Sequence, residues 1–442
     1  MAERTNILFI ITDQQSHNAL SCCGNEDLHT PNLDRLAERG VRFTNAYSTN
    51  PVCTPSRGSM FTGRMPHEVS IYANKQGIAE AFREQELGTL FKAGGYSTAY
   101  AGKWHVPNSL RIGDEHGFEV LSQLDDPNVA VTCSEYLGRR HDRPFLLVAS
   151  FDNPHNICEG SRFEPLPGGE VGEPPAVADC PLLPPNFQPP TDEPEMLRIN
   201  RKLWRRVQRD DEFTEDDWRR LRWTYYRLVE RVDAQVGQIL DALDEAKLTE
   251  TTLVAFCSDH GDCVGAHRWM QKFCLYEESV RVPMILAGPG VKAASQTGNR
   301  TDARLVSSGL DLMPTLLAAA GIDGPRDLRG ENLLDENSSR QAVYSEAKFG
   351  APDYEVSARM VRTERYKYVV HNTGRNAEQL FDLKNDPGEM VSLAKSSKHA
   401  RTLNDLRRML WNWLDETNDP FGRHYGTPKG RNLPGWDAYN RK

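Results

Sequence analysis

The segment Asn6-Ile-Leu-Phe-Ile-Ile-Thr12 is a continuous apolar run of strand length near the start of the chain. Similar apolar runs follow at residues 96–101, 144–151 and 251–258, and helical patterns separate them. Strands without a polar face that alternate with helices are typical of a parallel sheet covered on both sides. The sequence therefore predicts an α/β fold in which a large, mostly parallel sheet is sandwiched by helices.

The character of the sequence changes twice after this first part. Residues 165–194 contain ten prolines, which exclude a helix or a central strand and predict a surface excursion over about residues 160–195. From about residue 340, short strand-like segments alternate with turn residues, and a helical pattern over 401–414 follows them. We therefore expect a main domain over residues 1–340 and a smaller C-terminal α+β unit with an antiparallel sheet over residues 341–442.

The composition excludes several classes of protein. Among the 442 residues, 53 Lys and Arg stand against 62 Asp and Glu, a formal net charge of −9. An acidic chain without a long basic run argues against nucleic acid as a partner, and no stretch approaches the roughly 20 apolar residues that span a bilayer. Because the N-terminus lacks the pattern of a signal peptide, we expect a cytoplasmic protein. Its nine cysteines are then expected to be reduced thiols, with Cys53 as the one candidate for a special role.

Polar side chains follow each of the four predicted strands. They are Asp13 and Gln14, Lys103 and His105, Asp152 and His155, and Asp259 and His260. Since ligands of open α/β sheets bind outside the carboxyl ends of the strands, we expect these side chains to converge on one crevice. The set Asp13, Gln14, Asp259 and His260 offers oxygen atoms and one imidazole nitrogen, which suits a hard or borderline divalent cation.

The segment Pro51-Val-Cys53-Thr-Pro-Ser-Arg57 places a cysteine at the entrance of a helix that is expected to begin around Ser56. A helix N-terminus and a nearby arginine both lower the pKa of a thiol and attract anions. The residues alone leave two interpretations open, an inert cysteine and a reactive one.

Cys53-Thr-Pro-Ser-Arg57, followed by Thr62-Gly-Arg64, resembles the signature of the type I sulfatases, the formylglycine-dependent members of the alkaline phosphatase superfamily. The resemblance continues in family order through nearly the whole chain. It includes Thr12-Asp13-Gln14, Gly102-Lys103-Trp104-His105, Pro154-His155, Ser258-Asp259-His260-Gly261, Lys272, Arg281-Val282-Pro283 and Asp386-Pro387-Gly388-Glu389. It implies an alkaline phosphatase-like fold in which residues 1–340 are the catalytic sulfatase domain.

The resemblance also implies the mechanism of a sulfuric ester hydrolase. A formylglycine-generating maturation enzyme would oxidise Cys53 to an aldehyde, whose hydrate attacks the sulfur of a sulfate ester. By the same analogy, one divalent metal is bound, with calcium as the default ion and manganese or magnesium as alternatives. Its ligands would be Asp13, Gln14, the modified Cys53, Asp259 and His260.

Six catalytic residues follow from this analogy, beginning with Cys53 as the precursor of the nucleophile. Arg57 would support the diol, and His105 would be the base for its second hydroxyl. Lys103, His155 and Lys272 would bind the substrate. His155 would be the acid for the leaving alcohol, a role that Lys272 could share.

Three differences from the family pattern bear on metal and substrate. Gln14 stands where many members have Asp, and His260 where many have Asn, a pairing that resembles choline sulfatases and phosphonate monoester hydrolases. The third is Asn156, because members usually carry another residue and then proline after Pro154-His155. It leaves open how the chain runs after His155.

Several functions stay open on the sequence alone. The main hypothesis is hydrolysis of a small sulfated carbohydrate, because sulfated sugars are the commonest targets of the family. The alternatives are a phosphonate monoester or phosphodiester hydrolase, a choline sulfatase-like enzyme, a thiol enzyme with unmodified Cys53, and a non-catalytic binding protein. A homo-oligomer is compatible with the sequence.

Overall fold

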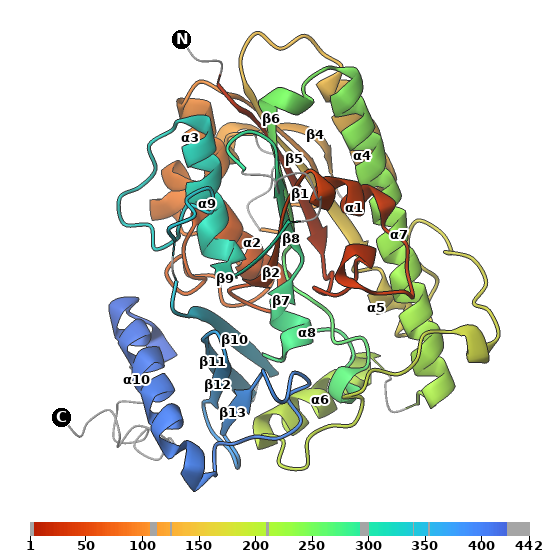
Figure 1. Ribbon diagram of the computed structural model, residues 1–442, viewed down its shortest axis with the longest axis vertical. Helices are drawn as coiled ribbons and strands as arrows, with labels where there is room; N and C mark the ends of the chain where they lie inside the picture. Colours follow the sequence, from red (N-terminus) through yellow and green to blue (C-terminus); the bar gives the residue numbers. More distant parts are fainter. Residues whose placement is uncertain are drawn as a thin grey trace.

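The computed structural model describes residues 4–106, 113–123, 126–208, 212–291, 300–338, 340–351 and 354–421. In this part of the chain, a nine-stranded sheet forms the centre of the larger part of the molecule. A separate four-stranded sheet lies below it (Figure 1). The large sheet has the strand order β4 (Glu119–Gln123), β3 (Ser97–Gly102), β5 (Phe145–Pro154), β1 (Asn6–Asp13), β6 (Thr252–Ser258), β8 (Met284–Ala287), β2 (Gly40–Tyr47) and β7 (Arg281–Val282), and β9 (Arg300–Ser307) pairs with β2.

The large sheet is mostly parallel, as predicted. β1 lies at its centre and pairs in parallel with β5 on one side and with β6 on the other. The sequence analysis did not predict the antiparallel pairings of β8 with β6 and β2, or of β7 with β2. These two strands span four and two residues, too few to give a periodic signal.

Side chains of β1 alternate between two hydrophobic cores, one on each face of the sheet. Ile7, Phe9 and Ile11 join the core with α2 (Cys53–Thr62), α3 (Leu87–Ala93) and α9 (Ser308–Ala320). Leu8 and Ile10 join the core with α1 (Pro31–Glu38), α4 (Asp126–Leu137) and α7 (Glu215–Glu245). Figure 1 shows these two sets of helices on opposite sides of the sheet. A strand buried on both faces explains the uninterrupted apolar run from which the fold was predicted.

The Pro-rich segment packs against α7. Over residues 165–194 it contains only one short 3-10 turn, Val177–Asp179, and no strand, as predicted. Arginines of α7 hold it by donating to its carbonyl groups: Arg219 donates to Cys180 and Pro181, and Arg231 to Gly169 and Glu170. The excursion is therefore a fixed wall and not a loose loop. The four-residue helix α5 (Ile157–Gly160) lies before it, and the 14-residue helix α6 (Glu195–Gln208) follows it.

The C-terminal unit is an antiparallel sheet with one helix, as predicted. Its strands β10 (Val343–Ala351), β11 (Tyr354–Arg362), β12 (Tyr366–His371) and β13 (Glu378–Asp382) pair in sequence order. Helix α10 (Ala400–Glu416) packs its leucine and tryptophan side chains on β11 and β12. The proposed division at residue 340 falls between α9 and β10, and the tail from residue 422 lies outside the described residues.

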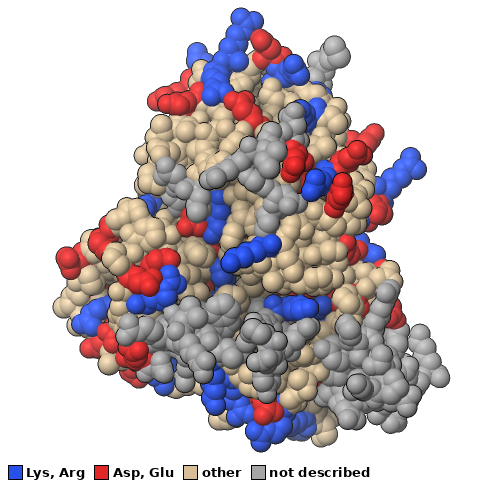
Figure 2. Space-filling view, turned by 180° about the vertical axis from the view of Figure 1, so that it is seen from behind, with Lys and Arg blue, Asp and Glu red and all other residues tan. Residues whose placement is uncertain are grey.

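Both signs of charge are mixed on the face of the molecule seen in Figure 2, where acidic side chains lie among basic ones over the upper half. None of the described helices combines the length and the hydropathy that a membrane-spanning segment requires.

A buried ion-pair network joins the loop after α2 to the small sheet. His67, in the loop after α2, lies 2.5 Å from Glu346 of β10 and 3.6 Å from Asp419, which also accepts two hydrogen bonds from Arg359. Burial lowers the pKa of His67, but Glu346 and Asp419 outweigh this effect and raise it to about 9. The folded protein thus favours the charged imidazole.

We expect His67 to make stability depend on pH. Because its pKa is raised above the unfolded value of 6.5, its contribution is complete below pH 6.5 and is lost as the pH rises through about 9. The difference in the free energy of unfolding between wild type and His67→Gln should be largest at pH 6. This difference should shrink by up to roughly 3 kcal/mol by pH 10. Denaturant titrations across this range measure the gap. Exposed His29→Gln is the control, and a gap for His67→Gln that does not change with pH would contradict the assignment.

Candidate active site

Cys53 begins helix α2 and lies at its N-terminal end. Val52 is extended, with φ −143° and ψ 139°, and its carbonyl already accepts the amide hydrogen of Ser56. The helix therefore begins at Cys53, three residues earlier than predicted. Pro55 did not exclude this start, because amide groups in the first turn of a helix need no partner within it.

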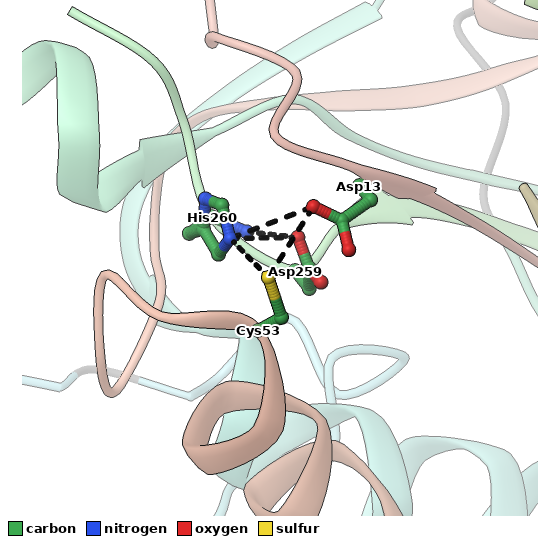
Figure 3. Close-up of side chains that lie close together, drawn as sticks. All are labelled: Asp13, Cys53, Asp259 and His260. Atoms are coloured by element: carbon green, nitrogen blue, oxygen red, sulfur yellow. Dashed lines mark hydrogen bonds and ion pairs between the residues drawn. The ribbon is translucent and has the colours of Figure 1, made fainter. Parts of the chain in front are cut away.

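Four potential ligand atoms meet at this point. The donor atoms of Asp13, Cys53, Asp259 and His260 all lie within 4.8 Å of one another, and all four residues are fully buried (Figure 3). The imidazole Nε2 lies 3.2 Å from the Cys53 Sγ and 3.6 Å from one oxygen of each aspartate. Asp13 ends β1, and Asp259 and His260 directly follow β6, so the pairing of these two strands brings three of the groups together. The start of α2 supplies the fourth, Cys53.

The ring of His260 is held in one tautomer. Its Nδ1 lies 2.9 Å from the carbonyl oxygen of Gly261. A carbonyl can only accept, so Nδ1 carries the hydrogen and the lone pair of Nε2 faces the two aspartates. This is the arrangement of a metal-ligating histidine whose other nitrogen is anchored to the backbone.

Gln14 lies beside the same cluster. Its backbone amide donates to Asp259 at 3.1 Å, and its side-chain nitrogen donates to Asp262 at 2.6 Å. Among the described residues, the carbonyl oxygen of the side chain accepts a single long contact of 3.8 Å from the Cys158 thiol, which leaves it able to bind a cation. Asp262 was missed by the sequence analysis, because its role depends on a contact across 248 positions of the chain.

Three cationic side chains surround the carboxylates. Lys103 lies 2.7 Å from Asp13 and 2.5 Å from Asp152. The Nζ of Lys272 lies 3.0 Å from the Cys53 Sγ and 3.2 Å from the imidazole Nε2 of His260. Arg57 lies behind the cluster, where it donates to Asp259 at 2.7 Å. All three predicted cations therefore belong to the site.

These charges shift the pKa of both Asp13 and Cys53. Burial raises the pKa of the Asp13 carboxyl, but Lys103, His155, Lys272 and Arg57 outweigh it and hold the pKa well below its usual value. Burial and Asp13 raise the pKa of the Cys53 thiol, whereas Lys272, His260 and Lys103 lower it by more, so the net shift is downward. The site is built to hold negative charge at residue 53.

The two remaining predicted histidines line a cavity next to this cluster. His105 is exposed and His155 is half-buried, and both lie on the cavity wall with Lys103. In the described part of the chain, no hydrogen bond joins the His105 ring to Cys53, so its role as a base stays a prediction. After His155 the chain turns into α5, and the side chain of Asn156 donates to Pro167 at 3.1 Å, which ties the start of the Pro-rich segment to the site.

The residues present fit one divalent cation. Two carboxylates, an imidazole lone pair and an amide oxygen are the donors that hard and borderline metals prefer. The cluster contains one cysteine, Cys53, whereas most structural zinc sites use at least two. The donors are buried and held by hydrogen bonds from the other side, as Gly261 and Asp262 hold His260 and Gln14. A preformed set of this kind is what metal binding requires.

This fold and this cluster at the carboxyl ends of β1 and β6 define an alkaline phosphatase-like hydrolase. The family model described as Sulfatase matches residues 5–322, and a second model, described as N-sulphoglucosamine sulphohydrolase, C-terminal, matches residues 265–416. The chain belongs to the sulfatase family and is a sulfuric ester hydrolase, which confirms the resemblance predicted from Cys53-Thr-Pro-Ser-Arg57.

Individual relatives agree with this assignment. The chain is similar to the Delta 4,5-hexuronate-2-O-sulfatase of Bacteroides thetaiotaomicron, with 32% identity over 99% of this chain and 95% of the relative. It is similar to the solved structure of a 2-O GAG sulfatase, with a TM-score of 0.85 and 29% identity over 100% of this chain and 98% of that one. It shares its fold with the phosphonate monoester hydrolase of Agrobacterium radiobacter, with a TM-score of 0.73 and 21% identity over 94% and 96% of the two chains.

Removal of the Asp259 carboxylate should remove metal binding. We expect Asp259→Asn, which keeps the size of the side chain, to lower the affinity for the divalent ion at least about tenfold, and Asp259→Ala to lower it further. Calorimetric titration and the metal content of the purified protein measure this. Asp241→Ala, on the surface of α7, is the matched control. Full metal content in a folded Asp259→Ala variant would exclude Asp259 as a ligand.

Proposed function

We propose that the chain hydrolyses the sulfate ester of a small sulfated carbohydrate, with a formylglycine made from Cys53 as nucleophile and one bound divalent metal. One observation carries the proposal: the Cys53 sulfur lies 3.0 Å from Lys272, 3.2 Å from His260 and 3.5 Å from Asp13. A residue at this position can contact a metal ligand set and a sulfate-binding cation at once. An inert core cysteine has no need of such neighbours.

The modification of Cys53 agrees with its surroundings. Hydrated formylglycine supplies a hydroxyl nucleophile that can be regenerated after sulfate leaves. The motif that a maturation enzyme would read lies at the start of α2, and Cys53 is fully buried in the folded chain. Conversion therefore has to precede folding of this segment, which makes the maturation enzyme a partner of the unfolded chain.

Asp13, Gln14, Asp259 and His260 would hold the metal, together with the modified residue 53. The bound ion supplies Lewis-acid stabilisation of the nucleophile and of the sulfate oxygens. Calcium is the ion that we propose. Manganese and magnesium are the alternatives, because an imidazole and an amide replace two of the oxygen donors that calcium prefers.

The chain's own side chains complete the reaction. Lys103 and Lys272 would neutralise the sulfate oxygens as they gain charge in the transition state. His155, on the cavity wall, would give its proton to the oxygen of the leaving alcohol, and His105 would accept the proton of the second hydroxyl. Arg57 is fully buried and donates to Asp259 and Asp13 from the side away from Cys53. Its effect on the nucleophile is therefore to hold these carboxylates in place.

A carbohydrate is supported by the cavity and by the relatives. The cavity next to the cluster has a volume of about 580 Å³, within the range of small-ligand sites. The relative from Bacteroides thetaiotaomicron is a hexuronate sulfatase by its name. The phosphonate monoester hydrolase of Agrobacterium radiobacter shares the fold at 21% identity. A phosphonate ester is therefore the alternative substrate to be compared with sulfate esters.

Mass spectrometry tests the nucleophile. In protein purified from its native host or co-produced with a maturation enzyme, we expect the peptide that contains residues 52–57 to carry an aldehyde in place of the Cys53 thiol. Cys257, also fully buried, is the internal control and should remain a thiol. Unmodified Cys53 in a fully active preparation would contradict the formylglycine mechanism.

Replacement of Lys272 tests sulfate binding. We expect Lys272→Met to lower kcat/KM for a sulfate ester about 100-fold or more, because a charge next to the reacting group is lost. Exposed Lys398→Met is the control and should keep wild-type kinetics. Parallel assays with a phosphonate monoester and choline sulfate complete the experiment, and a higher kcat/KM for either of these than for sulfated sugars would overturn the proposed substrate.

A further inference from the structure

The cavity beside the active site is lined by residues from several parts of the chain. Lys103, His105 and His155, to which we assign sulfate binding and proton transfer, are among them. Arg231 and Gln235 of α7 and Pro167 and Gly168 of the Pro-rich segment line the same cavity. Trp104 and Pro127 add apolar surface. A substrate whose sulfate binds at Lys103 would therefore share the cavity with Arg231 of α7.

Among the described lysine, arginine and carboxylate side chains that line this cavity, Arg231 alone has no ion-pair partner. Lys103 is paired with Asp13 and Asp152, and Glu159 is paired with Arg162 at 2.7 Å. Arg231 donates only to carbonyl oxygens, at 2.8 Å to Gly169, 2.9 Å to Glu170 and 3.5 Å to Gly168. Within the described residues, no carboxylate forms an ion pair with it. Its full positive charge is thus uncompensated in the protein.

The carbonyl contacts also hold the guanidinium group in place. A guanidinium has five N–H donors, and these contacts use three of them. Two donors remain for a ligand. A cation whose side chain is already ordered loses little conformational entropy when an anion binds, which makes it a preorganised anion site. Guanidinium groups bind carboxylates and sulfates through charge-assisted hydrogen bonds.

We infer that this cavity selects substrates with a second anionic group, a carboxylate or a further sulfate on the sugar, and that Arg231 binds this group. The inference rests on the proposed sulfate ester hydrolysis. It gives the substrate class as a dianionic saccharide, with its reacting sulfate at Lys103 and Lys272 and its second anion at α7. Arg231 is a specificity residue in this account, because it does not contact the reacting atoms.

Competition with an aryl sulfate reporter tests the inference without knowledge of which sugar is turned over. The matured enzyme hydrolyses the reporter in the presence of glucose 2-sulfate, glucuronate 2-sulfate or glucosamine 2,6-disulfate. For wild type, we expect the inhibition constant of at least one dianion to be about 10- to 100-fold lower than that of glucose 2-sulfate. For Arg231→Gln, this ratio should fall to within about twofold of one, and Arg231→Lys should restore part of it, because lysine keeps the charge. The arms with glucuronate and with the disulfate distinguish a carboxylate from a sulfate.

Arg227→Gln is the matched control on the same helix, because Arg227 is paired with Glu230 and does not line the cavity. It should leave the ratio unchanged. A wild-type ratio near one, or a high ratio that persists in Arg231→Gln, would overturn the inference and confine Arg231 to holding the Pro-rich segment. If wild type hydrolyses no sulfate ester at all, the proposed function fails, and the two failures are thereby distinguished.

Discussion

Three strands of the large sheet end at the guanidinium group of Arg57, and a fourth, β5, passes beside it. It donates to Asp259 after β6 at 2.7 Å and to the Lys103 carbonyl after β3 and the Ser150 hydroxyl of β5 at 2.8 Å each, and it lies 3.5 Å from Asp13 at the end of β1. The group is fully buried. A buried guanidinium is tolerated only when every side of it is bonded, so Arg57 fixes these strand ends relative to α2 and to Cys53, which lies one helical turn before it.

This constraint explains the electrostatics of the site. Arg57 occupies one oxygen of each aspartate from behind, and the other oxygens remain directed toward His260 and Cys53. Lys272 approaches the Asp13 oxygen that faces Cys53, and Lys103 binds the other Asp13 oxygen together with Arg57. The acidic chain thus contains a local site in which three cations face three carboxylates, those of Asp13, Asp152 and Asp259, and a doubly charged metal would give this site an excess of positive charge. An anionic ester is attracted to such a site even though the net charge of the protein is −9.

The sequence predicted the main parts of this arrangement because they are local. Continuous apolar runs identify strands buried on both faces, and residues such as Asp13 and Asp259 follow them directly. The contacts that hold these residues were not predictable, because they join distant positions: Gln14 with Asp262, Arg57 with Ser150, and His67 with Glu346. Arg231 has no sequence signal of its own, since on a helix it reads as a surface arginine. The helix start at Cys53 was missed because a proline two residues later suggested a later beginning.

The account depends on residue 53 and a metal sharing one site at the ends of β1 and β6. A crystal structure of the matured, metal-loaded enzyme, with anomalous scattering recorded for the metal, tests this most directly. We predict one anomalous peak bound by Asp13, Gln14, Asp259 and His260, with an oxidised residue 53 in contact with it. An active enzyme whose metal lies elsewhere, or whose residue 53 is an unmodified cysteine, would contradict the account.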